Sequence, residues 1–370
     1  MNILIKTFLL VFIAALFPQS TLAQSQSTQE FSKAKVTSII KNEVKNIGGK
    51  KNPYQKVTVQ ILDGAERNKI LTLEYGGVRV ITESQRLSKN DTVILSKLLS
   101  NNKSTYTISD IYRIPSLLFI ASLFFILVIL MTGKKGLGSL LGLIISLIVI
   151  AGFIVPQILK GADPLTISVI GSIIIMITTI YLAHGYNQRT TIAVIATAIS
   201  LFLTGVIAII AVKLSSLSGL GSEDAYNLML GSQIPINLHG LLLGGIIIGS
   251  LGVLDDTTTT QSTTVAELSD ANPSYSMKEL YRRGMIVGRE HIASLVNTLV
   301  LAYAGAGIAI FIFIVMSLQS QQYPWWVIFN SELLAEEIVR TIAGSIGLVL
   351  AVPITTLLAA FLAKNEIKIK

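Results

Sequence analysis

The chain has 370 residues, of which 51% are hydrophobic and only 14% are charged, with a formal net charge of +8. Soluble proteins carry about 25% charged residues, so this composition excludes an ordinary soluble protein and predicts a multi-pass membrane protein. The absence of cysteine from the sequence excludes disulfides, thiolate metal sites and cysteine nucleophiles.

The first residues have the pattern of a secretory signal peptide. Lys6 precedes an apolar run over residues 7–17, and the small residue Ala23 stands before Gln24. The apolar run is short for a membrane-spanning helix, so we predict that residues 1–23 are a signal peptide removed after Ala23. An uncleaved signal anchor, which would add an eighth span, is the alternative.

Residues 24–112 predict a small extracytoplasmic all-β domain with a barrel-like fold. Short alternating apolar segments predict strands at residues 35–41, 55–62, 69–75, 79–83, 92–96 and 105–111. This region also carries most of the net positive charge. A solvated basic surface is one interpretation, and attraction to an anionic envelope polymer or lipid headgroup is the other. We expect no nucleic-acid partner, because the domain should lie beyond the membrane.

Residues 113–370 predict a polytopic α-helical bundle whose main partner is the lipid bilayer. Apolar segments long enough to cross it lie at residues 115–131, 137–158, 165–183, 191–212, 238 onward, 292–316 and 338–362. Basic residues gather at alternate ends of these segments, which predicts a cytoplasmic C-terminus in a bacterial plasma membrane. Residues 273–289 predict a short amphipathic helix on the cytoplasmic membrane surface. The predicted fold class is therefore α+β, with seven spans after the signal peptide.

The fifth span begins with glycines at intervals of three and four residues. Small residues at this spacing let helices approach closely in lipid, where van der Waals packing drives association. We therefore predict that this helix is central in the bundle and packs through Gly240, Gly244, Gly245, Gly249 and Gly252.

Two adjacent carboxylates, Asp255 and Asp256, follow the glycines. Residues 241–267 would form a helix of roughly 40 Å, which would place both aspartates deep in a hydrocarbon core about 30 Å thick. A charge at that depth is costly, so it predicts a functional site. In the alternative, the span ends at Leu254 and both aspartates lie in water at the cytoplasmic interface. The candidate proton- or ion-binding residues are Asp255, Asp256, Thr259, Thr260, Thr263 and Glu267, with Asn297 and Tyr303 of the sixth span as polar partners.

The chemistry of these residues leaves two uses open. Mutual repulsion and burial favour the protonated form of one aspartate, so a proton could bind and leave near neutral pH. The same carboxylates and hydroxyls also suit a hard cation, although no metal-binding loop of known spacing is present, and we predict neither a metal site nor a cofactor. Searches for phosphate-binding, serine-hydrolase and zinc-protease motifs find none, so we predict that the protein is not an enzyme. A membrane hydrolase using the aspartate pair remains an alternative.

Two stretches resemble a known family. GGIIIGSLGVLDDTTTTQSTTVAEL and ELYRRGMIVGREHIASLVNTLVLAYAGAGI are similar to the signature region of the YibE/F family of multi-spanning bacterial membrane proteins. The glycine-rich helix that leads into Asp255 and Asp256 also resembles the proton-relay half of resistance-nodulation-division exporters and SecD/SecF motors. That second resemblance implies a proton site at the aspartate pair. This chain departs from their pattern in having seven spans, a small outer domain and a threonine run.

These observations predict an ion- or proton-coupled transporter or translocation component. The alternative is a non-transporting anchor or sensor whose basic outer domain binds an envelope ligand. A second membrane protein or a second copy of the chain is a further possible partner.

Overall fold

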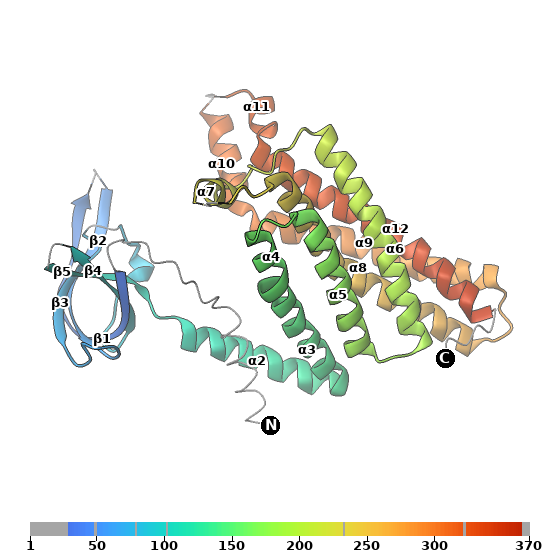
Figure 1. Cartoon of the computed structure of the whole chain (residues 1–370), viewed down its shortest axis with the longest axis horizontal. Coiled ribbons are helices and arrows are strands. Elements are labelled where there is room, and N and C mark those ends of the chain that lie inside the picture. The colour runs from blue at the N-terminus through green and yellow to red at the C-terminus, as the bar shows by residue number, and fades with distance from the viewer. Residues whose placement is uncertain are drawn as a thin grey trace. The chain divides into compact units, whose positions relative to one another are not determined.

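The computed structural model describes residues 29–47, 50–77, 80–100, 103–231, 234–320 and 323–364. The chain forms two compact units, which divide within a long helix between Leu127 and Val128 (Figure 1). One unit holds an antiparallel sheet and the other a helical bundle, and each is described by itself. The predicted signal peptide, residues 1–23, lies outside the described residues.

The sheet unit contains five antiparallel strands in the order β3-β2-β1-β4-β5. Their bounds are β1 (Gln29–Ile47), β2 (Lys50–Ile61), β3 (Ile70–Tyr75), β4 (Thr92–Ser100) and β5 (Lys103–Ile111). Bulges in β1 bend the sheet so that it curls into a half-barrel (Figure 1). Its two edges come together through side chains, because Lys69 Nζ lies 3.0 Å from the hydroxyl of Tyr106 on β5. The predicted barrel-like β domain is therefore confirmed.

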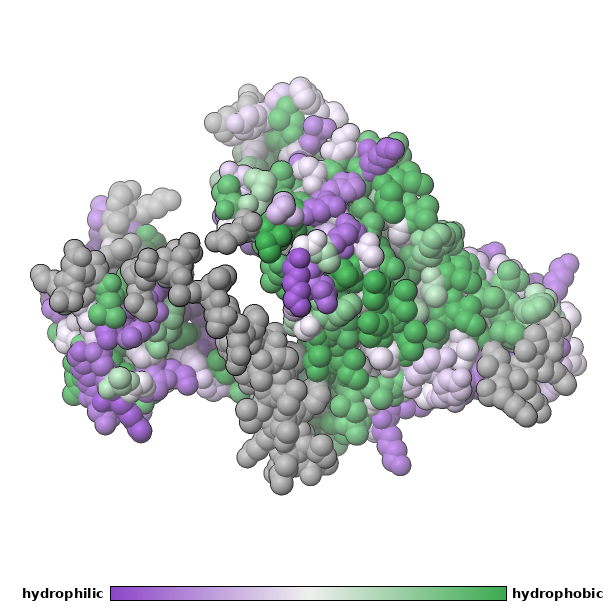
Figure 2. All heavy atoms as spheres, in the orientation of Figure 1, coloured by the Kyte–Doolittle hydropathy of each residue, from purple (hydrophilic) through white to green (hydrophobic). Residues whose placement is uncertain are grey.

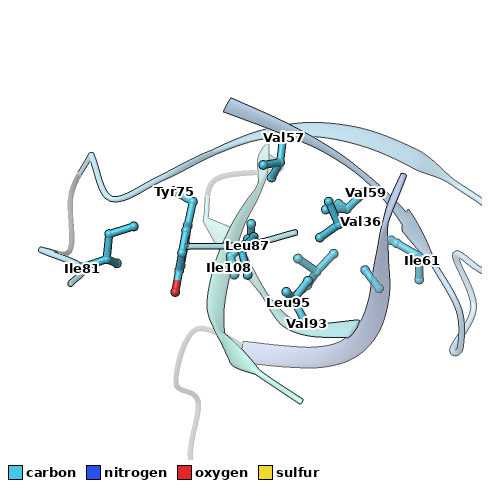
Figure 3. Packing of buried hydrophobic residues seen from close by; sticks show 11 residues of the cluster. Val36, Val57, Val59, Ile61, Tyr75, Ile81, Leu87, Val93, Leu95 and Ile108 are labelled. Atoms are coloured by element: carbon cyan, nitrogen blue, oxygen red, sulfur yellow. The ribbon is translucent and has the colours of Figure 1, made fainter. Parts of the chain in front are cut away.

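Alternating apolar residues fill the inside of the half-barrel. Val36, Val57, Val59, Val93 and Leu95 come from three neighbouring strands and are fully buried (Figure 3). Their spacing of two along each strand places them on the same face of the sheet. This alternation is the pattern from which the strands were predicted.

The predicted strand at residues 79–83 is wrong within the described residues. Residues 80–82 are not in a strand, and a short 3-10 helix, η1 (Glu83–Gln85), follows them. The backbone N–H of Thr82 donates to Gln85 Oε1 at 2.9 Å, which fixes this turn. Leu87 then enters the core, where its N–H donates to Gln55 Oε1 at 2.8 Å. The segment therefore covers the half-barrel as a loop because side-chain bonds replace the ladder of a sixth strand.

Seven helical segments of the described chain are long and apolar enough to cross a membrane. These are α2 (Ile114–Thr132), the run of α3 (Lys134–Val149), η2 (Ile150–Ile154) and α4 (Val155–Leu159), then α5 (Pro164–His184), α6 (Gln188–Leu214), α8 (Leu238–Ala271), α9 (Met277–Ala306) and α12 (Glu332–Lys364). Shorter helices are α7 (Glu223–Gly231), α10 (Ile308–Gln319) and α11 (Trp325–Phe329). The visible face of the bundle carries a broad hydrophobic band with hydrophilic residues toward its ends (Figure 2). The chain is a multi-pass membrane protein of mixed helix and sheet class, as predicted.

Helix α8 is the centre of the bundle and packs against α5, α6, α9 and α12. Its apolar half buries Leu243, Ile246 and Leu251, and Leu254 below them is fully buried. The run from α3 to α4 contains the π-helical turn η2, whose Ile154 packs so closely on α5 that a Cβ at Gly171 would lie 2.4 Å from it. These contacts place α3 and α5 beside the polar half of α8.

Of the predicted surface helix at residues 273–289, residues 277–289 are instead the first half of α9, and residues 273–276 form the turn before it. The structure continues it without interruption to Ala306, and a break at Gly307 separates it from α10, inside the predicted span 292–316. Leu280 is fully buried in a cluster with Val265 of α8 and Ala360 of α12. Part of the apolar stripe that suggested a membrane-surface helix therefore contacts neighbouring helices, whereas Ile286 is exposed.

Candidate functional site: a polar groove along α8

A groove with a volume of about 1060 Å³ runs along the polar half of α8, with α3 and α5 as its other walls. It is lined by all six candidate residues of α8: Asp255, Asp256, Thr259, Thr260, Thr263 and Glu267. The facing walls contribute Lys135, Ser139, Leu143 and Ser146 of α3 and Thr179, Ala183 and His184 of α5. The structure thus brings the predicted α8 residues together in one space.

The 3.6-residue period of α8 separates its polar residues into a packed face and an open face. On the packed face, the Thr258 and Thr197 hydroxyls lie 2.6 Å apart, and Ser262 Oγ donates to the carbonyl of Arg189 at 2.8 Å. Gln261 Nε2 donates to the carbonyl of Gly284 at 2.9 Å. Because these hydroxyls and the Gln261 amide N–H have partners, a polar helix half is stable inside the bundle, although Gln261 Oε1 is buried without a partner among the described residues.

The two aspartates differ in their surroundings because neighbouring residues on a helix point about 100° apart. Asp255 is partly buried, and the hydroxyl of Thr179 on α5 donates to its Oδ2 at 3.3 Å. Asp256 is exposed and lines the open groove. The pair therefore combines one carboxylate held by a neighbouring helix with one that is accessible to a solute in the groove.

The packed part of α8 does not end at Leu254. Beyond the aspartates α8 continues to Ala271, roughly 24 Å of helix, and α5 continues from Thr179 to His184, roughly 8 Å. The fully buried Val265 lies in this part of α8. The aspartates thus lie within the bundle and not at a frayed helix end.

Arg189 of α6 pairs with two carboxylates near the C-terminal end of α8. Its Nη1 donates to Glu267 Oε1 at 2.5 Å, and its Nη2 contacts Asp270, so α6 is joined to α8 by two ion pairs. A second pocket of about 540 Å³ adjoins the groove and shares Lys135, His184, Thr259 and Thr263 with it. Glu267 is therefore neutralised by an arginine, whereas Asp256 faces open space.

Asn297 and Tyr303, the predicted partners of the aspartates, lie elsewhere. Both side chains are exposed on α9, and neither lines the groove. Tyr303 instead lines a separate, largely apolar pocket of about 590 Å³ between α9, α10 and α12. In the part of the chain described here, the hydrogen-bond partner of the Asp255 side chain is Thr179 of α5.

The residues missed from sequence lie on α3 and α5. Ser139 and Ser146 are seven residues apart, a spacing that places both on one face of α3. Thr179 interrupts a strongly apolar helix. Polar residues in register inside these spans were the available signal, but nothing in the sequence indicated which neighbour they would face.

The glycines of α8 divide into two groups. A Cβ at Gly244 would lie 2.3 Å from Ser168 Oγ, and one at Gly245 would lie 3.3 Å from Arg340, so these glycines allow close packing. A Cβ at Gly249 or Gly252 would meet nothing within 4 Å. The prediction that Gly249 and Gly252 pack against another helix is therefore wrong within this chain, and Gly252 lines the groove instead.

Metal coordination has little support in the groove. Across the described ranges, no three side chains from His, Cys, Asp and Glu are grouped so that they could hold a metal ion. The oxygens that the groove offers are two adjacent carboxylates and several threonine and serine hydroxyls. This donor set can bind and release a proton or hold a weakly bound hard cation.

Comparisons with known proteins place the chain in a family. A search of curated proteins and a search of solved structures found no significant match. The family model described as YibE/F-like protein matches residues 120–365, which include α8, the groove and the whole bundle from the first span onward. The resemblance to exporters and SecD/SecF motors gains no support from these comparisons and stays a prediction. The chain belongs to the YibE/F-like protein family.

Proposed function

We propose that this protein is an ion-coupled transporter or translocation component of the bacterial plasma membrane, and that the aspartate pair is its proton-binding site. One observation carries the proposal: an acidic pair halfway along the central helix lines a polar groove, with Asp255 held by Thr179 and Asp256 open. An anchor needs no such groove. An intramembrane carboxylate that is partly desolvated and accessible from one side can take up and release a proton.

The roles within the groove follow from the contacts. Asp256 exchanges a proton with solutes in the groove because its side chain is exposed. Asp255 binds the proton at a site that is less accessible to solutes, because its side chain is partly buried. The Thr179 hydroxyl stabilises the charged form of Asp255. The Arg189 ion pairs join α6 to α8 through Glu267 and Asp270. Lys135 and His184 at the shared wall set the charge that an entering ion meets.

Carbodiimide labelling tests this site without knowledge of the substrate. An apolar carbodiimide reacts with protonated carboxyls in membrane interiors, so the full chain in proteoliposomes should be modified at Asp255 increasingly as pH falls. Mass spectrometry would locate the adduct, and Asp224 on α7 is the internal control, because it is an exposed carboxylate in the same chain. If Na⁺ protects Asp255 from labelling at constant pH, the site binds a metal cation in place of a proton. Equal labelling of Asp255 and Asp224 at every pH would refute the proposal.

Flux measurements test the coupling. Asp255→Asn and Asp256→Asn should each lower proton flux into proteoliposomes by about tenfold or more, because the carrier group is lost. Asp224→Asn should keep the parent rate. Unchanged proton flux in both groove variants would show that the acidic pair has no role in transport.

The sensor alternative keeps one specific observation in its favour. Lys41 lies directly opposite Lys56 in the β1-β2 register, and like charges at such positions destabilise a sheet. An anionic envelope polymer would relieve this repulsion. If chains carrying Asp255→Asn and Asp256→Asn fully complement a deletion strain while chains lacking the β domain fail, the outer domain carries the function.

A further inference from the structure

A buried carboxylate lies near the start of α12, far along the chain from the aspartate pair. Glu336 is only 5% exposed. Its spacing predicts an ion pair with Arg340, but Arg340 Nε pairs with Glu337 Oε1 at 3.3 Å. Glu336 Oε1 instead accepts a hydrogen bond from the backbone N–H of Gly221 at 2.9 Å. A buried charge is thus used to hold a loop.

Glu332, one turn earlier, holds the same loop. Its Oε1 accepts from the N–H of Ser218 at 2.6 Å, from the Ser218 hydroxyl at 2.6 Å and from the N–H of Gly219 at 3.1 Å. Hydrogen bonds from backbone N–H groups to a carboxylate are stronger than those between neutral groups. We name residues 215–222, between α6 and α7, the latch loop.

Two glycines allow the latch loop to lie close against its neighbours. Gly219 has a φ of +89°, and a Cβ there would lie 2.3 Å from the carbonyl oxygen of Leu238, the first residue of α8. A Cβ at Gly221 would lie 2.6 Å from Glu336 Cδ. Leu217 is buried in a cluster with Leu242 of α8 and residues of α6 and α12. The loop therefore joins α12 to the start of the groove-bearing helix.

We propose that Glu332 and Glu336 form a proton-operated latch, which holds the loop when both carboxylates are charged and releases it when they are protonated. Protonation removes the negative charge that strengthens the bonds to the loop N–H groups. The latch lies at the other end of α8 from the Arg189 ion pairs and does not rest on the proposed function.

The charged groups around the latch are few. Within the described residues, the side chains whose charges act on Glu336 are Glu332, Glu337 and Arg340, all on α12. The latch loop contributes backbone N–H groups and contains no titratable side chain. His239 of α8 is exposed. Acid therefore adds protons at α12 without a competing titration in the loop.

Cysteine labelling can measure release, because the parent sequence has no cysteine. Leu217→Cys reports opening, since Leu217 is 6% exposed in the latched loop. Ser215→Cys, exposed in the same loop, corrects for the effect of pH on thiol reactivity. The measured quantity is the ratio of the two labelling rates in the full-length protein in detergent micelles, between pH 8 and pH 3.

We expect this ratio to rise about tenfold from pH 8 to pH 3, the effect of losing one or two charge-assisted hydrogen bonds. With Glu332→Gln and Glu336→Gln together, the ratio should stay low at every pH, because amide oxygens still accept the N–H bonds and cannot gain a proton. With Glu332→Ala and Glu336→Ala together, it should be high at every pH. A ratio independent of pH in the parent, or a pH dependence that survives in the glutamine variant, would overturn the latch. Neither result depends on whether the groove conducts protons.

Discussion

Single residues determine the surroundings of the two carboxylates in the groove. Asp255 and Asp256 are adjacent in sequence, yet one accepts a hydrogen bond from another helix and the other lies open. The sequence predicted both as candidates because a carboxylate pair in a span is unusual. It could not predict the asymmetry, because that depends on Thr179, a residue some 76 positions away along the chain. The same limit explains why Asn297 and Tyr303 were expected as partners.

Removing the Thr179 hydroxyl should change the protonation of Asp255. In Thr179→Val, the charged form of Asp255 loses its donor, so carbodiimide labelling of Asp255 at pH 7 should rise about fivefold. Thr178→Val is the matched control, because its hydroxyl donates to the carbonyl of Ile174 on its own helix at 2.7 Å. Equal labelling in the two variants would show that Thr179 does not act on Asp255.

Glu66 in the sheet unit gives a pH dependence with a defined sign. A hydrogen bond from the Tyr106 hydroxyl at 2.5 Å is the main cause that lowers the pKa of Glu66 below its ordinary value of 4.5. A lowered pKa in the folded state contributes stability above about pH 4.5, which is lost as the pH falls through the lowered value. In Tyr106→Phe, hydrogen exchange of β3 should therefore be less sensitive to pH between about 5 and 3 than in the parent chain. Identical acid sensitivity in the two proteins would exclude this bond as the cause.

At the scale of elements, periodicity predicted most helices and strands but not their contacts. The apolar alternation of β1, β2 and β4 and the long apolar runs of the spans follow directly from burial on one face or in lipid. The strand predicted at residues 79–83 was wrong because the N–H of Thr82 bonds to the side chain of Gln85, and Leu87 beyond it bonds to Gln55, so the segment forms a loop. Residues 273–289 were misplaced because an amphipathic stripe fits a membrane surface and a helix bundle equally well. Periodicity alone also cannot distinguish a packing glycine from one that borders a groove.

Two glycine substitutions separate these roles. Gly138 of α3 lies against α5, where a Cβ would come 2.3 Å from the carbonyl oxygen of Leu182, so Gly138→Ala should destabilise the bundle by about 1–3 kcal/mol. Gly249→Ala, into open space on α8, should leave stability unchanged or raise it by up to about 1 kcal/mol through helix propensity. Thermal unfolding of the two variants in detergent would measure both. A large loss for Gly249→Ala would show that a partner covers that face of α8.

At the scale of the whole molecule, composition predicted a multi-pass membrane protein, and short alternating apolar segments predicted an added β domain. The family match covers residues 120–365 and so leaves most of the sheet unit to be understood from its own residues. That unit has its own hydrophobic core, which includes Val36, Val59 and Leu95. The burial of this core comes from residues of the sheet unit itself.

The sheet unit should therefore fold by itself. A fragment of residues 29–112 should give a dispersed amide spectrum and one cooperative unfolding transition, because its core is complete within those residues. Val59→Asp should abolish that transition by placing a charge in the core, whereas Thr72→Asp on β3 serves as a less disruptive control. A fragment that stays unfolded at all salt concentrations would show that the sheet needs the membrane unit.

The wide turn η2 sets the rotational phase of the wall that faces the aspartates. A π-helical turn inserts one extra residue into an α-helix. Upstream of it, Ser139 and Ser146 face the groove, and within it Ile154 is fixed against Gly171. If the same residues formed a regular α-helix, one side would be rotated relative to the other by about 100°. The hydroxyls would then leave the groove while Ile154 kept its contact, so the wide turn determines whether the wall opposite the acidic pair is polar.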